Sequence, residues 1–196
     1  MATYSSIAYS PISGGGSRVL LAESTASSSS TVSFTSGIDS TYREYLFTFI
    51  NIHPSNDNAD SFGFNMSIDG GSNYNVAKTT TAFQPYHNEA DNSTGLDYSA
   101  DRDLAQGTGD QVLNEGANLS ADNDHGLSGY LRLFNPSSTT FVKNFIAQVS
   151  NTSSADYSLC RFAAGYANTT SAVNAVIFRM SSNNIDAGTF KLYGIN

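Results

Sequence analysis

Short segments with an apolar side chain at every second position recur along this chain, and they constrain its fold more than any other feature. The clearest is residues 62–68, where Phe, Phe, Met and Ile alternate with Gly, Asn and Ser. A period of two places the apolar set on one face of a β-strand. In residues 42–52 both alternating sets are apolar, which indicates a strand in the centre of a sandwich or at a contact between subunits.

Similar patterns, with polar connectors between them, cover most of the remaining chain. Further strands are expected at residues 18–24, 31–34, from Tyr74 onward, and at 127–134, 141–147, 157–167, 173–180 and 187–195. The sequence DGGSN at residues 69–73 predicts a hairpin that pairs the strands on either side of it. No long amphipathic helix and no alternation of strands with helices is present. We predict an all-β fold, a single antiparallel β-sandwich of eight to ten strands, jelly-roll-like, with meander or Greek-key connections.

The N-terminal segment has a different composition. Tyr4, Ile7 and Tyr9 stand among Ser and Ala, and three consecutive glycines follow. Consecutive glycines disfavour helix and strand and act as a flexible joint. We predict that residues 1–17 are an N-terminal arm with a glycine hinge, whose three large side chains pack on a neighbouring subunit, and that residues 18–196 are one β-sandwich domain. A frayed terminus is the alternative.

Residues 84–126 have the weakest pattern and the most acidic composition. Nine of the 17 acidic residues lie there, against Arg102 as the one Lys or Arg. A structureless loop of this length is unusual inside a compact domain. We therefore expect short strands or a turn of helix to interrupt it, the latter beginning near Asp101.

Charge excludes several classes of function. Charged residues make up only 13% of the chain and the formal net charge is −8. Nucleic-acid binding needs clustered Lys and Arg, whereas the nine basic residues are scattered. There is no basic amphipathic helix and no apolar run near the roughly 18 residues of a transmembrane helix. The first residues lack the features of a secretory signal. We expect a protein made in a cytoplasm that binds neither nucleic acid nor membrane.

Residue types that often act in catalysis are present, but they do not form a catalytic motif. His53, His87 and His125 all fall in expected loops, where a solvated side chain is the ordinary role. Cys160 is the one cysteine and lies in an alternating segment, so we expect a small buried apolar side chain on a strand. The sequence contains no nucleophile elbow, zinc-protease, phosphate-loop or paired-cysteine motif. We predict that the protein is not an enzyme.

Glycoside hydrolysis is the alternative that needs only paired carboxylates. Asp97, Asp101 and Asp103 are the candidates. Sugar sites usually include aromatic platforms, often tryptophan, and this chain has none. Tyr86 and Tyr98 are the nearby substitutes.

Two loop clusters have the composition of calcium sites, because Ca²⁺ prefers carboxylate and amide oxygens. They contain Asp57 with Asp60, and Asp122 with Asp124. Neither cluster has the spacing of an EF-hand, and Asp and Asn are also the ordinary residues of turns. We predict no cofactor or metal, and keep Ca²⁺ at these four carboxylates as the alternative.

Three segments carry a resemblance to a known group of proteins. They read SGIDSTYREYLFTFINIHPSNDNADSFGFNMSIDGGSNYN, LRLFNPSSTTFVKNFIAQ and NNIDAGTFKLYGIN. They resemble small virion proteins of tailed bacteriophages, especially marine and cyanobacterial phages, over roughly residues 17–196. The resemblance lies in the overall amino-acid sequence and not in a catalytic motif, so it identifies no functional residue. It implies a β-sandwich or jelly-roll structural component, either a capsid decoration (cement) protein or part of a tail fibre or adsorption device.

The resemblance leads to a ranked set of functions. The first is a capsid decoration protein, made in the host cytoplasm, that sits on the virion head as a homotrimer and bridges capsomers by binding the major capsid protein. A single compact domain favours this over the alternative, a tail-fibre or adsorption-device β module that binds a host surface glycan. The third is a glycan hydrolase. In the first two, the polar loop HPSNDNADS is expected at one end of the sandwich, where contacts vary without disturbing the core.

Overall fold

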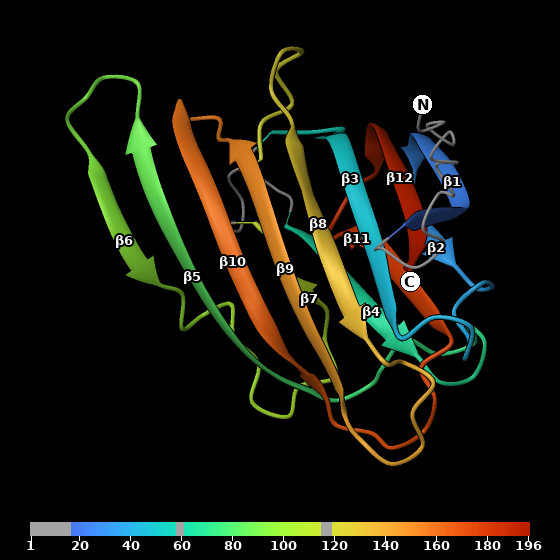
Figure 1. The fold of residues 1–196 in the computed structure, drawn as a ribbon. Helices are drawn as coiled ribbons and strands as arrows, with labels where there is room; N and C mark the ends of the chain where they lie inside the picture. Colours follow the sequence, from blue (N-terminus) through green and yellow to red (C-terminus); the bar gives the residue numbers. More distant parts are fainter. Residues whose placement is uncertain (1–16, 58–60, 115–118) are drawn as a thin grey trace, which may run out of the picture.

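The computed structural model describes residues 17–57, 61–114 and 119–196, and it consists of two antiparallel β-sheets packed face to face (Figure 1). This confirms the predicted all-β sandwich. Eight strands form the large sheet, in the order β1-β12-β3-β8-β9-β10-β5-β6, and four form the small sheet, in the order β2-β11-β4-β7. Within those residues no helix is long and apolar enough to cross a membrane.

Each segment predicted as a strand contains one, and two more occur in the weakly patterned region. The bounds are β1 Arg18–Ser29, β2 Val32–Phe34, β3 Glu44–Pro54, β4 Phe62–Ser67, β5 Lys78–Asn88, β6 Thr94–Tyr98, β7 Gln111–Val112, β8 Leu127–Phe134, β9 Lys143–Thr152, β10 Tyr157–Ala167, β11 Ala175–Met180 and β12 Ile185–Ile195. The added strands are β6 and β7. The expected turn of helix near Asp101 is not formed; that segment is a turn and loop.

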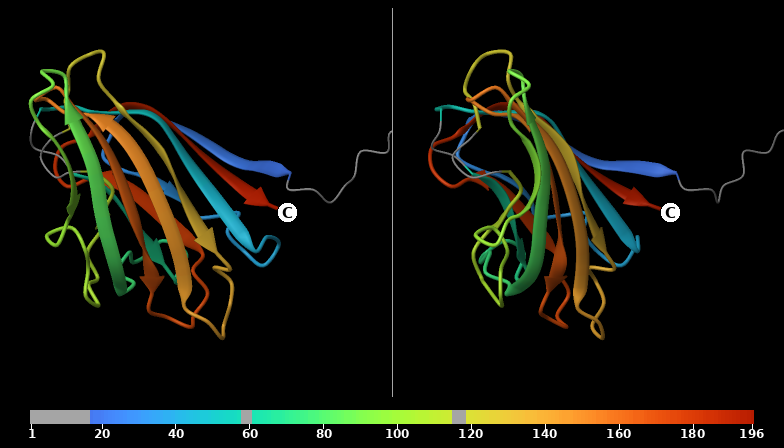
Figure 2. Two further views of the ribbon diagram at one scale, coloured as in Figure 1. Left: turned by 60° about the vertical axis from the view of Figure 1, so that its left-hand side comes forward. Right: turned by 90° about the vertical axis from the view of Figure 1, so that its left-hand side faces the viewer.

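The strand pairing is nested, as in a jelly roll. Strand β3 pairs with β12, β4 with β11, β5 with β10, and β8 with β9. The three outer pairs alternate between the large sheet, the small sheet and the large sheet, while the innermost pair lies in the large sheet between β3 and β10. Figure 2 shows the twist of the large sheet, in which β1 and β12 run obliquely to β5 and β10.

The turn after β4 does not join paired strands, so the hairpin predicted there was wrong. The turn itself forms, because Gly70 and Gly71 adopt φ of 74° and 92° and the Asp69 carboxylate accepts a hydrogen bond from the Asn73 backbone. Strand β4, however, pairs with β11 and β7, and the chain crosses over residues 73–77 to begin β5 in the other sheet. Local turn chemistry sets the turn but not the partner of the strand that follows.

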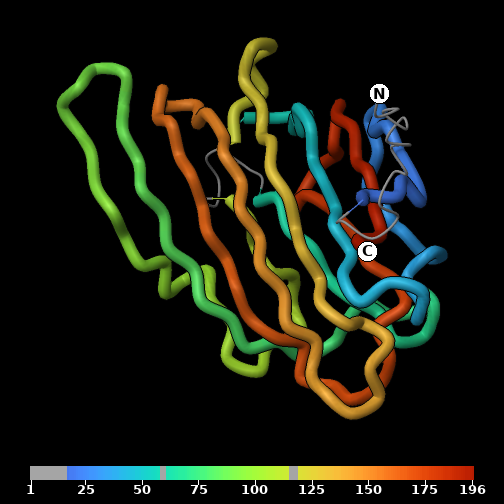
Figure 3. The backbone as a smooth tube through the Cα atoms, viewed as in Figure 1, coloured from blue at the N-terminus to red at the C-terminus, as the bar shows by residue number. Residues whose placement is uncertain are grey.

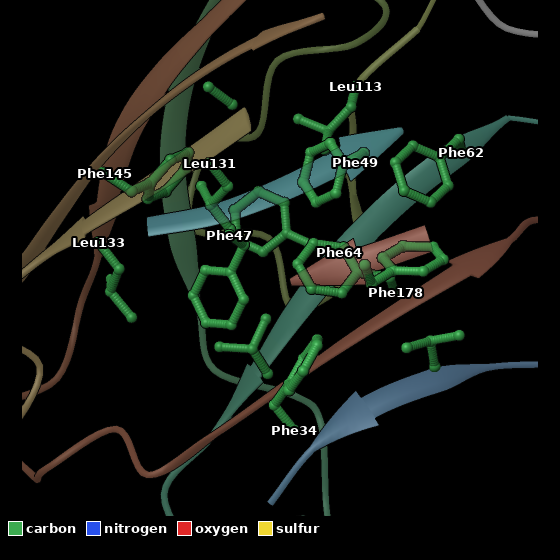
Figure 4. Close-up of a cluster of buried hydrophobic side chains, with 14 of the residues drawn as sticks. Phe34, Phe47, Phe49, Phe62, Phe64, Leu113, Leu131, Leu133, Phe145 and Phe178 are labelled. Carbon is green, nitrogen blue, oxygen red and sulfur yellow. The ribbon is translucent and has the colours of Figure 1, made fainter. Parts of the chain in front are cut away.

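Phenylalanine rings fill the centre of the sandwich (Figure 4). Phe178 of β11 is fully buried. Its ring centroid lies 4.9–6.4 Å from those of six other rings, Phe34, Phe47, Phe49, Phe62, Phe64 and Phe190. Aromatic pairs at such distances add about 0.5–1.5 kcal/mol each beyond the burial of their area. This side chain therefore contacts rings from both sheets at the centre of the core.

A buried polar network joins the sheets at a second place. Arg179 donates hydrogen bonds of 2.6 and 2.8 Å to the two oxygens of Asp110, and Asn65 donates to the same carboxylate at 3.0 Å. Lys78 of β5 donates from Nζ to Asn65 at 2.7 Å and to the carbonyl oxygen of Val76 at 2.8 Å. Burial lowers the pKa of Lys78 to about 8, although the negative charge of Asp110 opposes the shift.

We expect Phe178→Ala to lower the free energy of unfolding by about 3–5 kcal/mol, because the cavity would lie between both sheets. Urea denaturation followed by far-UV circular dichroism measures the change. Phe141→Ala is the matched control, since Phe141 is 68% exposed and its loss should cost no more than about 0.5 kcal/mol. A similar loss in both variants would contradict the central role of Phe178.

We expect Lys78 to make the folded state more stable as pH rises from 8 to 10. The pKa of Lys78 is depressed in the folded state, so between these values the unfolded chain binds a proton that the folded chain has released. The free energy of unfolding then rises with pH, by about 2 kcal/mol over this window. Lys78→Met should lack this rise when both proteins are unfolded in urea at each pH. Parallel pH profiles would contradict the assignment.

Candidate functional site

The structure brings together, at one end of the sandwich, residues that the sequence placed in separate loops. His53 lies near the end of β3 and His125 just before β8. The His53 Nε2 atom lies 3.2 Å from the carbonyl oxygen of Asp122, and the His125 Nδ1 atom lies 4.0 Å from the Asp122 carboxylate. His53 Nδ1 is also 3.8 Å from the carboxylate of Asp186 on β12. The third histidine, His87, lies apart from this group and contacts an exposed carboxylate near the β5–β6 turn.

β-Bulges position this group. The register of β3 against β8 shifts between Phe49 and Ile52, and Asn51 there adopts φ of 52°. The register of β12 against β3 also shifts on both sides of Ala187, next to Gly188 with φ of 133°. Bulges bend a strand and redirect its side chains. Here they border a cleft of about 460 Å³ between the ends of β3 and β12 and the loop before β8.

The cleft is suited to charge pairing. Its lining includes His53, His125, Asp124 and Asp186. Among the described residues, no three His, Cys, Asp or Glu side chains lie close enough together to bind a metal ion. The side chains of His53 and His125 are only 16% and 15% exposed, whereas those of their carboxylate neighbours Asp186 and Asp122 are 53% and 65% exposed. These contacts attach the loop before β8 to residues of β3 and β12.

The calcium candidates act mainly as turn residues where they are described. The Asp57 carboxylate accepts hydrogen bonds from the backbone of Ala121 at 2.5 Å and from the hydroxyl of Ser120 at 3.4 Å. The backbone of Asp122 in turn donates to the Ser120 hydroxyl at 3.1 Å. The two candidate clusters therefore lie next to each other, because Asp57 of the first cluster accepts hydrogen bonds from the loop that contains the second. Asp60 lies outside the described residues, and Asp124 lines the cleft.

The hydrolase candidates lie on β6 and in the loop after it. The Asp103 carboxylate accepts a hydrogen bond from the Tyr98 hydroxyl at 2.5 Å, and Asp101 forms a 3.3 Å ion pair with Arg102. Asp97 points to the other side of β6 from Tyr98, because successive strand residues face opposite ways. The Asp97 carboxylate and the Asp103 carboxylate, which contacts Tyr98, therefore lie toward opposite sides of β6.

The outer face of the large sheet, meaning the face turned away from the small sheet, is a candidate surface that sequence reasoning largely missed. Its side chains follow from the register, since residues directly opposite each other in paired strands share a face. Six large apolar side chains on it are exposed: Leu20, Ile50, Phe83, Leu96, Tyr98 and Ile146. No described element covers them.

Aromatic and amide side chains form a row across this face. Tyr130, Gln148, Phe162, Phe83 and Tyr98 lie opposite one another on β8, β9, β10, β5 and β6. The Phe83 and Phe162 rings stack with centroids 4.9 Å apart and an interplanar angle of 8°. The hydroxyl of Tyr130 donates to the Gln148 amide oxygen at 3.1 Å. Contacts between neighbours therefore hold the exposed row in a defined conformation.

Charge is excluded from half of the outer face. Along the described strands β9, β10, β5 and β6, no Asp, Glu, Lys or Arg side chain points to it. On the other half, Arg132 pairs with Glu44, and Lys191 pairs with Glu23 at 3.2 Å. Arg18 also lies on that half, opposite Ile195, so the charged side chains of the outer face are confined to the half formed by β1, β12, β3 and β8.

Cys160 lies on a strand as predicted, but on the outer face and only partly buried. Its Sγ atom lies 3.4 Å from the amide nitrogen of Gln148.

Comparison with family models, with curated proteins and with solved structures finds no match to this chain. The resemblance to phage virion proteins stays a prediction from the sequence. The candidate interface contact of Tyr4, Ile7 and Tyr9 also stays a prediction, because these residues lie outside the described part of the chain.

We expect Asp57→Ala to lower the free energy of unfolding by about 1–2 kcal/mol, because two hydrogen bonds to a carboxylate are lost. The loss should be the same in calcium and in EDTA, as measured by urea denaturation. If calcium instead stabilised the wild type and not the variant, the carboxylate would be a metal ligand. Glu89→Ala, in the exposed turn after β5, controls for loss of charge.

Proposed function

We propose that this chain is a structural protein of a tailed-bacteriophage virion, and more specifically a capsid decoration protein that docks on the head through the outer face of its large sheet. The observation that supports this best is the exposed outer face, whose half formed by β9, β10, β5 and β6 presents no charged strand residue although the chain has a net charge of −8. Exposed apolar surface of this extent is typical of protein–protein contact sites.

The size of the face is adequate for a specific complex. Eight strands at about 4.8 Å spacing and about 10 residues long give an area on the order of 1,000 Å². A standard interface takes about 800 Å² from each partner. An uncharged patch also lets acidic copies approach a shared shell with little like-charge repulsion. The proposed partners are the major capsid protein and further copies of this chain in a homotrimer.

The N-terminal arm extends this proposal. Residues 1–17 precede β1, which is an edge strand of the large sheet beside the outer face. An arm that starts at this edge is suited to reach a neighbouring copy, and closed rings of such contacts are common in symmetric assemblies. The protein is proposed to be made in the host cytoplasm, to act on the virion surface and to have no catalytic role.

Placing a charge on the outer face tests whether this face is the docking surface. We expect Phe83→Glu and Ile146→Glu to reduce incorporation into particles by about tenfold or more, because a buried unpaired charge costs several kcal/mol. Ile68→Glu is the matched control, since Ile68 and Ile146 are 44% and 46% exposed but Ile68 lies off the outer face. The amount of each variant relative to the major capsid protein is measured by mass spectrometry of purified virions.

Cryo-electron microscopy of the same particles tests the location. Hundreds of copies between capsomers are expected for a decoration protein. A few copies at the tail would overturn that role and favour the adsorption module. Normal incorporation of both glutamate variants, Phe83→Glu and Ile146→Glu, would show that the outer face is not the docking surface.

A further inference from the structure

A groove of about 320 Å³ lies on the opposite, inner side of the large sheet. It is formed where β5 and β6 make up one edge of that sheet, at the edge opposite β1 (Figure 3). Side chains of β5, β6 and β10 and of the turn before β10 line it. Its volume is at the lower end of the about 300–1,000 Å³ found for small-molecule sites.

Two tyrosines form the aromatic part of the groove. The rings of Tyr86 on β5 and Tyr157 on β10 lie 6.0 Å apart with an interplanar angle of 58°. Gly95 lies opposite Tyr86 on β6, and a Cβ atom there would come within 2.6 Å of the Tyr86 hydroxyl. The Tyr86 ring therefore lies against the backbone of β6, in space that only glycine leaves open.

Polar groups adjoin the rings and differ in their hydrogen-bonding roles. The Asp97 carboxylate beside Tyr86 raises the pKa of that phenol, since its negative charge opposes ionisation. Within the described residues Asp97 forms no salt bridge. Gln84 is only 6% exposed, and its amide oxygen accepts a hydrogen bond of 2.9 Å from Arg161. This orients the amide and leaves its NH₂ group as the donor beside the groove.

We propose that this groove binds a neutral pyranose sugar. One face of a pyranose ring is made of C–H groups that pack on a tyrosine ring, while its hydroxyls both donate and accept. Asp97 accepts from those hydroxyls and Gln84 donates to them, with the hydroxyl of Ser93 at the rim. The proposal goes beyond the docking role, because it concerns the other face of the sheet.

Charge separates this ligand from the alternatives. None of the described lining side chains is Lys or Arg, and Asp97 is anionic. Phosphorylated ligands, nucleotides and acidic sugars are therefore disfavoured. A quaternary ammonium ion would bind where aromatic faces surround it. Here two rings border an open groove, and the Gln84 NH₂ group would face the cation with the wrong polarity.

The test is saturation-transfer difference NMR on the full-length protein, with methyl α-glucoside, methyl α-galactoside, methyl α-mannoside and N-acetylglucosamine as separate probes. We expect transfer to the ring protons of at least one sugar, and binding weaker by about tenfold or more in Tyr86→Ala and in Asp97→Asn. Tyr130→Ala, which removes an aromatic ring from the outer face, should bind as the wild type does. Asp97→Asn is nearly isosteric, so it tests the site even if Tyr86→Ala proves unstable.

Three results would overturn the proposal: no transfer to any of the four sugars, transfer that both groove variants leave unchanged, or stronger groove-dependent transfer to choline or to adenosine monophosphate. Tyr86→Ala should still be incorporated into particles normally. Failure of the sugar site and failure of the docking face are thus separate outcomes.

Discussion

The contact of Phe178 with six surrounding rings is the interaction on which the two-sheet arrangement depends. Those rings come from β2, β3, β4 and β12, so the cluster joins strands near both ends of the chain. Nested pairing brings them together, because β11 reaches the small sheet only after β4 has been placed there. The core therefore contains residues from Phe34 to Phe190, which span most of the chain.

The unequal size of the sheets leaves surfaces without cover. A four-stranded sheet packs on only part of an eight-stranded one. The core rings cover the inner face near β3. The edge formed by β5 and β6 extends into solvent, and Tyr86 and Tyr157 line a groove there. No element in the described part of the chain covers the outer face either. Both candidate surfaces thus arise from the same cause, which is the mismatch between the layers, and neither requires a change in the core.

Alternation in the sequence predicts strands well because the period of two is a local property. Residues 157–167 were predicted as a strand and form β10 with those bounds. Partner choice is not local, so the turn at residues 69–73 was correctly located while its hairpin was wrong. Short strands were expected within residues 84–126, and β6 and β7 lie there, but the sequence did not give their positions. They have five and two residues, and β6 is largely exposed on both faces, so an alternating pattern is too short there to locate a strand.

The candidate surfaces were less predictable, because they depend on register. Residues 42–52 were the one segment whose two apolar sets were interpreted as contacts on both faces; the outward residues of β5 look ordinary until they are aligned with Phe162 and Tyr98. Strand β6 makes the dependence clear. Leu96 and Tyr98 face the outer surface, while Asp97 between them faces the groove. A slip of one residue would exchange these faces, placing a carboxylate on the docking surface. The close approach of Tyr86 to Gly95 opposes that slip, so one contact sets the register for both surfaces.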